Sequence, residues 1–303
     1  MKNKLIVVAG ATGKLGQLII GAVLANPEAR VRALVRDPKK PEAAALARDR
    51  VELFAFDATA ATDAARAEAV KGAFAVVSAL QGGPDIIIDA QLALARAAKA
   101  AGARRFIPSD YSYNVFTLPE GINVNSDWRR ASAFQARKLA GDGFEVVHVM
   151  QGIFLDPAVM AFCGIYDKEK GAVRYWGDGK TPIDWTTWED TARFTAAAAL
   201  DDGQVPEHLF VSGDRMDLLT FAKTWEAARG KKLDVKRLGS LEDLEQETKR
   251  RLQAEPQNMY AWLPLMYQRG VFSGQALLGP SSNARYSAIK PETVAQVIAR
   301  GAV

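Results

Sequence analysis

The chain has 303 residues, of which 49% are hydrophobic, with 39 basic and 35 acidic side chains. This is the composition of a globular protein, and the small, scattered positive excess excludes a nucleic-acid-binding arm or a polybasic membrane segment. One cysteine excludes an intrachain disulfide, two isolated histidines argue against a zinc site, and no apolar run is long enough to span a membrane. We therefore expect a cytoplasmic protein that binds no metal.

The first half of the chain alternates apolar β-type runs with helical segments. Continuous apolar runs such as Leu5–Ala9 and Val31–Val35 are typical of strands buried on both faces of a parallel sheet. Their regular alternation with helices predicts right-handed crossovers and a doubly wound sheet. The expected strands are 5–9, 31–35, 51–56, 74–78, 106–107 and 146–150, and the expected helices are 14–25, 41–48, 63–70, 85–101 and 128–139.

After about residue 151 this alternation stops and aromatic residues become more frequent. No Gly-, Ser- or Pro-rich linker separates the two halves. We expect an α/β protein with a Rossmann-type dinucleotide-binding domain at 1–150, to which part of 180–212 returns, and a smaller, interleaved α+β substrate lobe at 151–303. The expected elements of this lobe are strands 171–176, 183–187 and 209–211, and helices 189–200, 217–229, 240–254, 259–268 and 291–300.

A glycine-rich loop follows the first predicted strand and opens the first predicted helix. Glycine permits a tight turn and lets the backbone approach a pyrophosphate, whose charge the helix N-terminus stabilises. The placement predicts a nicotinamide dinucleotide site, whereas a ligand-free strand–helix turn is the weaker alternative. The predicted cofactor-binding residues of this loop are Gly10, Thr12, Gly13, Lys14, Leu15 and Gly16.

The residue after the second predicted strand indicates which dinucleotide binds. An acidic residue in this region is typical of NAD-binding sheets, but the chain has Arg36, whose guanidinium suits a ribose 2′-phosphate. Two charge-assisted hydrogen bonds would favour NADP (NADPH) over NAD by roughly 100-fold or more. The alternative is that the neighbouring Asp37 binds the ribose 2′-hydroxyl instead, as in an NAD site. Asp57, after the third strand, is expected either at the adenine edge or as a helix cap.

These motifs, with Leu34-Val35-Arg36-Asp37 and the segment Arg105–Tyr111, resemble the NmrA-like atypical short-chain dehydrogenase/reductases. Within them the chain is most similar to the isoflavone-reductase-like group, over about residues 4–200. The resemblance implies that Ala79 and Gln81 line the cofactor, and that Pro108 and Tyr111 lie at its nicotinamide end.

The resemblance also implies a lysine on the helix after the fifth strand, as a general acid/base or a cofactor-positioning group. The matching position holds Arg137, with Lys138 adjacent, or lies near Arg130, depending on which neighbouring residues anchor the match. Arginine stays protonated and is a poor proton relay. Lys138, Arg137 and Tyr111 are the candidate catalytic residues, and solvated surface charges are the alternative for the two basic ones.

We therefore expect an enzyme, an NADPH-dependent reductase of a small apolar acceptor, with phenylpropanoid-, quinone- and carbonyl-type compounds left open. Tyr113, Phe154 and Tyr166 are the candidate substrate contacts, with core packing as the alternative. A non-catalytic, NADP(H)-sensing regulator of the NmrA type is the alternative function, and the displaced lysine is its main support. The chain is expected to be a monomer or a homodimer.

Three further features are expected to carry no chemistry. The string Tyr166–Lys170 has the Tyr-x-x-x-Lys spacing of ordinary short-chain dehydrogenases, but it follows the sixth predicted strand rather than the fifth. Its position also counts against a nucleotide-sugar epimerase, a third hypothesis. His148 lies in an apolar strand, and Cys163 has no evident base partner, so both are expected in the core.

Overall fold

The computed structural model describes residues 4–303, which divide into two compact units. The chain crosses between the units more often than the expected boundary near residue 150 implies. Unit 1 comprises the residues through Tyr111, Trp128–Val149 and Thr191–Leu209, and unit 2 comprises Ser112–Asp127, Met150–Asp190 and Phe210–Val303.

Unit 1 contains a six-stranded sheet in the order β3-β2-β1-β4-β5-β6, in which every neighbouring pair is parallel. This confirms the predicted doubly wound sheet. The strand order reverses between β1 and β4, and in such sheets ligands bind beyond the carboxyl ends of the strands at this switch point. The strands are β1 (Lys4–Ala9), β2 (Ala29–Val35), β3 (Val51–Ala55), β4 (Ala75–Ser78), β5 (Arg105–Ile107) and β6 (Glu145–Val146).

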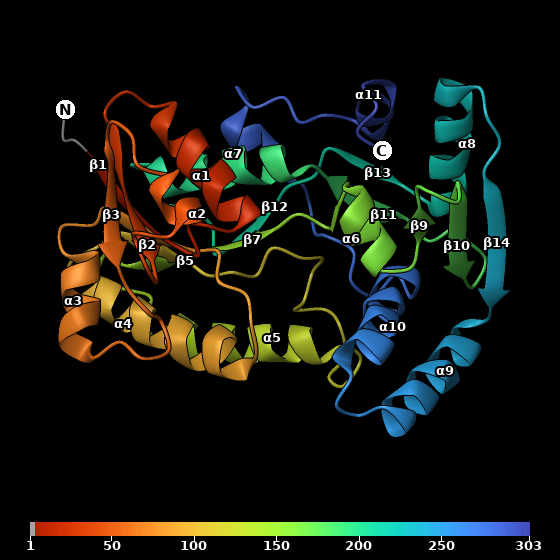
Figure 1. Ribbon diagram of the computed structural model, residues 1–303, viewed down its shortest axis with the longest axis horizontal. Helices are drawn as coiled ribbons and strands as arrows, with labels where there is room; N and C mark the ends of the chain where they lie inside the picture. The colour runs from red at the N-terminus through yellow and green to blue at the C-terminus, as the bar shows by residue number, and fades with distance from the viewer. Residues whose placement is uncertain (1–3) are drawn as a thin grey trace. The chain divides into compact units, whose positions relative to one another are not determined.

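The helices of unit 1 lie mostly where the sequence predicts them (Figure 1). The segment predicted at 41–48 is helical over only four residues. The helix predicted at 128 begins at Val124. The helices are α1 (Lys14–Leu24), α2 (Pro41–Ala44), α3 (Asp63–Val70), the π-helical η1 (Asp85–Ala90), α4 (Gln91–Ala100), α5 (Val124–Arg137) and α7 (Trp188–Leu200).

The apolar runs of the sheet are buried on both faces. Leu5 and Val7 pack in a core cluster with residues of α3 and α4, whereas Ile6 and Val8, also inaccessible to solvent, point to the other face. Because successive side chains of a strand alternate between faces, burial on both sides demands an uninterrupted apolar run.

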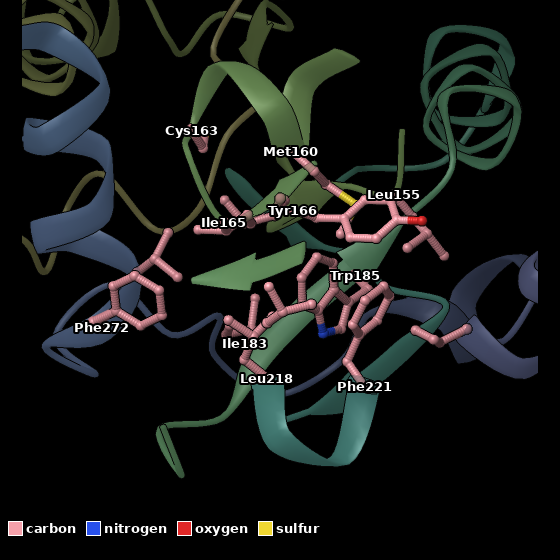
Figure 2. Close-up of a cluster of buried hydrophobic side chains, with 14 of the residues drawn as sticks. Leu155, Met160, Cys163, Ile165, Tyr166, Ile183, Trp185, Leu218, Phe221 and Phe272 are labelled. Atoms are coloured by element: carbon pink, nitrogen blue, oxygen red, sulfur yellow. The ribbon is translucent and has the colours of Figure 1, made fainter. Parts of the chain in front are cut away.

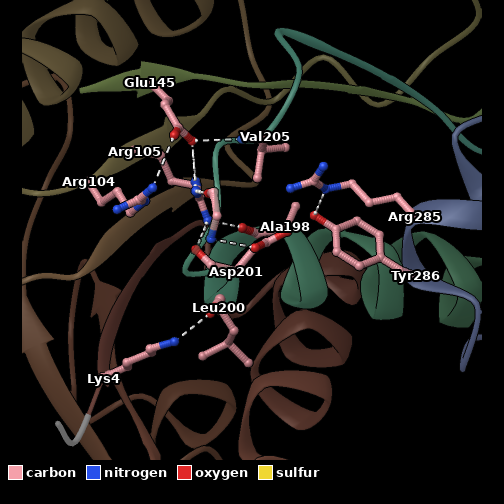
Figure 3. A network of polar contacts seen from close by, with 11 residues as sticks. Lys4, Arg104, Arg105, Glu145, Ala198, Leu200, Asp201, Val205, Arg285 and Tyr286 are labelled. Carbon is pink, nitrogen blue, oxygen red and sulfur yellow. Dashed lines mark hydrogen bonds and ion pairs between the residues drawn. The ribbon is translucent and has the colours of Figure 1, made fainter. Parts of the chain in front are cut away.

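A buried arginine ties the end of α7 to the sheet of unit 1 (Figure 3). The Arg105 side chain is fully buried, and its Nε and Nη2 donate to Glu145 Oε2 at 2.9 and 2.7 Å. The guanidinium also donates to the carbonyls of Ala198, Asp201 and Gly203. A cation is favourable at a helix C-terminus, where carbonyls lack intrahelical partners. This contact joins residues 198–203 to β5 and β6 of unit 1.

Unit 2 is an α+β unit with two three-stranded sheets, β14-β10-β9 and β13-β11-β8. Its core includes Trp185, stacked on Phe221 at a ring-centroid distance of 5.4 Å (Figure 2). The sequence does not predict β14, because its residues are almost all exposed and show no apolar run. The strands are β8 (Ile153–Phe154), β9 (Tyr166–Asp167), β10 (Ala172–Trp176), β11 (Ile183–Thr186), β13 (Asp214–Met216) and β14 (Asp234–Gly239).

Most helices of unit 2 match the expected ones, although α6 is an addition. None of the helices within residues 4–303 combines the length and apolar character needed to cross a membrane. The helices are α6 (Pro157–Phe162), α8 (Leu218–Arg229), α9 (Leu241–Ala254), α10 (Met259–Phe272), the 3₁₀-helical η2 (Asn283–Tyr286) and α11 (Val294–Ala299). The two remaining strands, β7 (His148–Met150) and β12 (His208–Phe210), pair with each other, and each begins in unit 1 and ends in unit 2.

Candidate dinucleotide-binding site

Two glycines of the loop after β1 are required by the packing of unit 1 itself. Gly10 has a φ of +75°, and a Cβ placed there would lie 2.5 Å from the carbonyl oxygen of Ala79. A Cβ on Gly16 would overlap the carbonyl oxygen of Gly10. Glycine at these positions therefore lets the loop turn tightly and approach the backbone that follows β4.

Gly13, by contrast, is not required by the protein's own packing. It is the exposed N-cap of α1 with a φ of −70°, and a Cβ there would meet nothing closer than the Gly10 carbonyl oxygen at 3.4 Å. Such a contact is ordinary for a β-carbon. The missing side chain leaves room for a ligand to approach the backbone, which is the fit that a pyrophosphate requires.

The N-terminus of α1 has the electrostatic character of an anion site. Its first turn contains no acidic residue, and its N-cap contributes no side chain to the helix N–H groups. Lys14 is exposed, Thr12 is half-buried, and Leu15 is buried against the core. A helix N-terminus with its positive dipole end uncompensated favours a bound anion.

The carboxyl ends of β2 and β3 carry charged side chains at the same edge. Arg36 is exposed directly after β2. Asp37 Oδ1 accepts a hydrogen bond from the Lys39 N–H at 2.9 Å. Asp57 accepts from the hydroxyl and the N–H of Thr59, and these bonds, with a smaller effect of Arg36, hold the pKa of the Asp57 carboxyl below its usual value. Both carboxylates thus stabilise turns of their own loops.

The segment after β5 is held by side chains from two helices. Pro108 is buried. The Ser109 N–H donates to Gln91 Oε1 at 2.7 Å, and the Ser109 carbonyl accepts from Arg129 Nε at 3.2 Å. Sequence reasoning missed both contacts, because Gln91 and Arg129 are distant from Ser109 along the chain. After β4, Ala79 is half-buried and Gln81 is exposed.

Asp110 and His148 form a buried pair next to this segment. Asp110 Oδ2 lies 2.5 Å from His148 Nδ1, and both side chains are almost completely inaccessible. Burial, together with the nearby negative charge of Asp110, raises the pKa of Tyr111 above its ordinary value. We therefore expect Tyr111 to remain protonated at neutral pH.

Arg137 and Lys138 lie farther along α5 than the residues that meet the β5 loop. Arg137 Nε donates to Glu207 Oε1 at 2.6 Å, and Lys138, just past the helix end, is exposed. Phe134, on the same helical face as Arg137, is 53% exposed. Arg129 is eight residues earlier, about 12 Å along the helix axis. The structure thus brings Arg129, and not Arg137 or Lys138, to the segment after β5.

The three aromatic residues predicted to contact substrate are buried within unit 2. Tyr113 Oη accepts from Asn123 Nδ2 at 2.8 Å, and burial raises the pKa of its hydroxyl. The ring of Phe154 stacks on Trp188. Tyr166 packs edge-on against Phe221 and is 1% exposed. Within this unit they act as core residues, the alternative left open by the sequence.

The doubly wound parallel sheet and the glycine loop at its switch point define the class of protein: a Rossmann-type α/β protein. Residues 2–126 match the model of the NmrA-like family. This match, over less than half of the chain, confirms the predicted resemblance to that family. No curated protein sequence matches the chain significantly.

Several solved structures that are similar to the whole chain are reductases by name, and one is named as a nucleoside-diphosphate-sugar epimerase from Staphylococcus aureus. An isoflavone reductase has a TM-score of 0.80 at 19% identity, covering 99% of both chains. A leucoanthocyanidin reductase–NADPH complex from Vitis vinifera has a TM-score of 0.77 at 19% identity, covering 98% of both chains. A protein described as AtPrR2 with NADP⁺ and (+)-pinoresinol has a TM-score of 0.78 at 19% identity, covering 99% of both. At these identities the likeness shows the fold.

Proposed function

We propose that the chain binds NADPH at the carboxyl edge of its parallel sheet and acts as a reductase of a small apolar acceptor. The observation that carries the proposal is Gly13, a glycine that packing does not require, at the uncompensated N-terminus of α1. Three of the similar structures contain NADP⁺ or NADPH by name, which supports the same cofactor here.

The residues proposed to hold the cofactor follow from their places along the sheet edge. The backbone from Gly10 to Gly16, with the side chains of Thr12 and Lys14, would bind the pyrophosphate. Arg36 would pair with the 2′-phosphate, since Asp37 and Asp57 are engaged in their own turns and Arg36 is exposed beside them. The further proposed contacts are Leu15, Ala79, Gln81 and Pro108.

When bound, NADPH supplies a hydride. Tyr111 is proposed to donate a hydrogen bond at the nicotinamide end while remaining protonated. The proposed acceptor is of phenylpropanoid, quinone or carbonyl type, and the names of the similar reductases support the first of these.

The placement of Lys138 and Arg137 favours a second candidate, a non-catalytic NADP(H)-sensing regulator. Both residues lie more than two helical turns beyond Arg129 along the chain, and neither contacts the segment after β5 through a bond observed in residues 4–303. A sensor needs the cofactor site but no proton-transferring lysine. Steady oxidation of NADPH with any of a panel of quinones, aldehydes and phenylpropanoid ethers would exclude it.

The cofactor proposal is tested by calorimetric titration of the wild type and Arg36→Ala with NADPH and NADH. Loss of the charge-assisted contacts, each about 1.5–3 kcal/mol, is expected to weaken NADPH binding by at least about tenfold and leave NADH binding within about threefold. Arg30→Ala, which removes an exposed arginine from the other end of β2, is the matched control and is expected to change neither. Equal loss of both ligands in Arg36→Ala contradicts the assignment of Arg36.

A further inference from the structure

The segment after β5 is bonded by side chains from other elements of unit 1. Gln91 opens α4 and is 1% exposed, although glutamine is mostly a surface residue. Its Oε1 accepts from the Ser109 N–H at 2.7 Å, and its Nε2 donates to the Ile87 carbonyl in η1 at 2.9 Å. Both ends of this amide are therefore used to join the loop after β5 to the π-helical turn that leads into α4.

Arg129 bonds the other backbone polar group of Ser109, its carbonyl. Its Nε donates to the Ser109 carbonyl at 3.2 Å. It lies on the helical face of α5 that also carries Ala133 and Ala136, which are 4% and 3% exposed, so this face packs inward. The N–H and the carbonyl of one loop residue are thus bonded by side chains from two different helices.

The next residue is held by a third element. The Asp110 carboxylate contacts His148 Nδ1 of β7 at 2.5 Å, with both side chains buried. A buried carboxylate without a partner is strongly disfavoured, so this pair keeps Asp110 in a single position. Side chains of α4, α5 and β7 together hold two successive residues of a loop at the carboxyl edge of the sheet.

We infer that Gln91 and Arg129 are positioning residues that keep the Pro108–Tyr111 segment rigid for the nicotinamide half of the cofactor. The inference rests on the proposed function, which places this segment at that end. A loop ordered before binding loses less conformational freedom when the ligand arrives, so its restraints contribute to affinity without touching the ligand. Removing these restraints should therefore weaken the binding of the nicotinamide half of the cofactor and leave the binding of the adenosine half unchanged.

The experiment compares two ligands on the wild type and on the variants Gln91→Met and Arg129→Met. NADPH contains both halves of the cofactor, whereas adenosine 2′,5′-bisphosphate contains only the half assigned to Arg36. Methionine has the length of glutamine and reaches the position of the arginine Nε, and in both variants it removes the hydrogen bonds of the native side chain. Each variant is expected to bind NADPH about tenfold more weakly than the wild type and adenosine 2′,5′-bisphosphate with unchanged affinity.

Two further variants sharpen the comparison. Arg137→Met removes another arginine of α5, which pairs with Glu207 on the surface. We expect this variant to bind NADPH and adenosine 2′,5′-bisphosphate with unchanged affinity. Arg129→Lys retains a donor and is expected to restore part of the NADPH affinity.

The outcomes separate this inference from the function on which it rests. If the wild type binds neither ligand, the proposed cofactor site fails and the inference fails with it. If the wild type binds NADPH and both methionine variants match it, only the inference is overturned. An equal weakening of both ligands also overturns it, because that pattern indicates a general structural role.

Discussion

Replacing each loop glycine with alanine separates the glycines that the fold requires from the one proposed to admit a ligand. In Gly13→Ala, the poorer N-cap costs about 1 kcal/mol and the reduced freedom of the unfolded chain returns about 0.4–1 kcal/mol, so the free energy of unfolding should change by less than about 1 kcal/mol. The nearest atom to the new Cβ, at 3.4 Å, adds no strain. The same methyl group would occupy the approach to the N–H groups of α1, and loss of one charge-assisted bond corresponds to about 10–150-fold weaker NADPH binding.

Gly10→Ala is the contrasting variant. Its positive φ alone costs about 1–2 kcal/mol for alanine, and the new Cβ would lie 2.5 Å from the backbone oxygen of Ala79, which cannot move without disturbing β4. We expect its free energy of unfolding to fall by at least about 2 kcal/mol.

Urea denaturation measures the stabilities of these variants, and calorimetry measures NADPH binding. A Gly13→Ala protein that is stable and binds NADPH like the wild type would refute the reasoning, because the ligand would then not approach the backbone at this glycine. Destabilisation of Gly13→Ala to the level of Gly10→Ala would also refute it, since the packing would then require both glycines.

Two further predictions concern the core. Arg105→Met leaves the half-buried Glu145 and the carbonyls at the end of α7 without their donor, so the free energy of unfolding in urea should fall by about 3–5 kcal/mol. The control Arg104→Met removes a 3.7 Å contact of a more exposed arginine with the same carboxylate and should cost less than about 1 kcal/mol. Equal losses in the two variants would contradict the role of Arg105. Burial raises the pKa of the Cys163 thiol to about 12, so this thiol should resist iodoacetamide in the folded protein at pH 8 and react with it in urea. The free energy of unfolding should decline as pH rises above about 9, because only the unfolded thiol then ionises. Rapid labelling of the folded protein would show instead that the thiol is accessible.

The sequence by itself determined the sheet of unit 1 and its glycine loop. Strands such as β1 are buried on both faces and therefore need continuous apolar runs, which are visible without a structure. The spacing from Gly10 to Gly16 is equally local, because one turn and one helix start contain it. The position of Arg36 directly after β2 follows from the same reasoning, and its contact with the cofactor stays a proposal.

Only the tertiary structure decided which helical residue meets the loop after β5. The sequence analysis considered Arg137, Lys138 and Arg130 on α5, and the structure brings Arg129 to Ser109 instead. Neighbouring residues on a helix differ in direction by about 100°, so an uncertainty of one residue changes which side chain faces inward. The bonds from Gln91 and His148 join segments 18 and 38 residues apart, and no local pattern encodes such pairings.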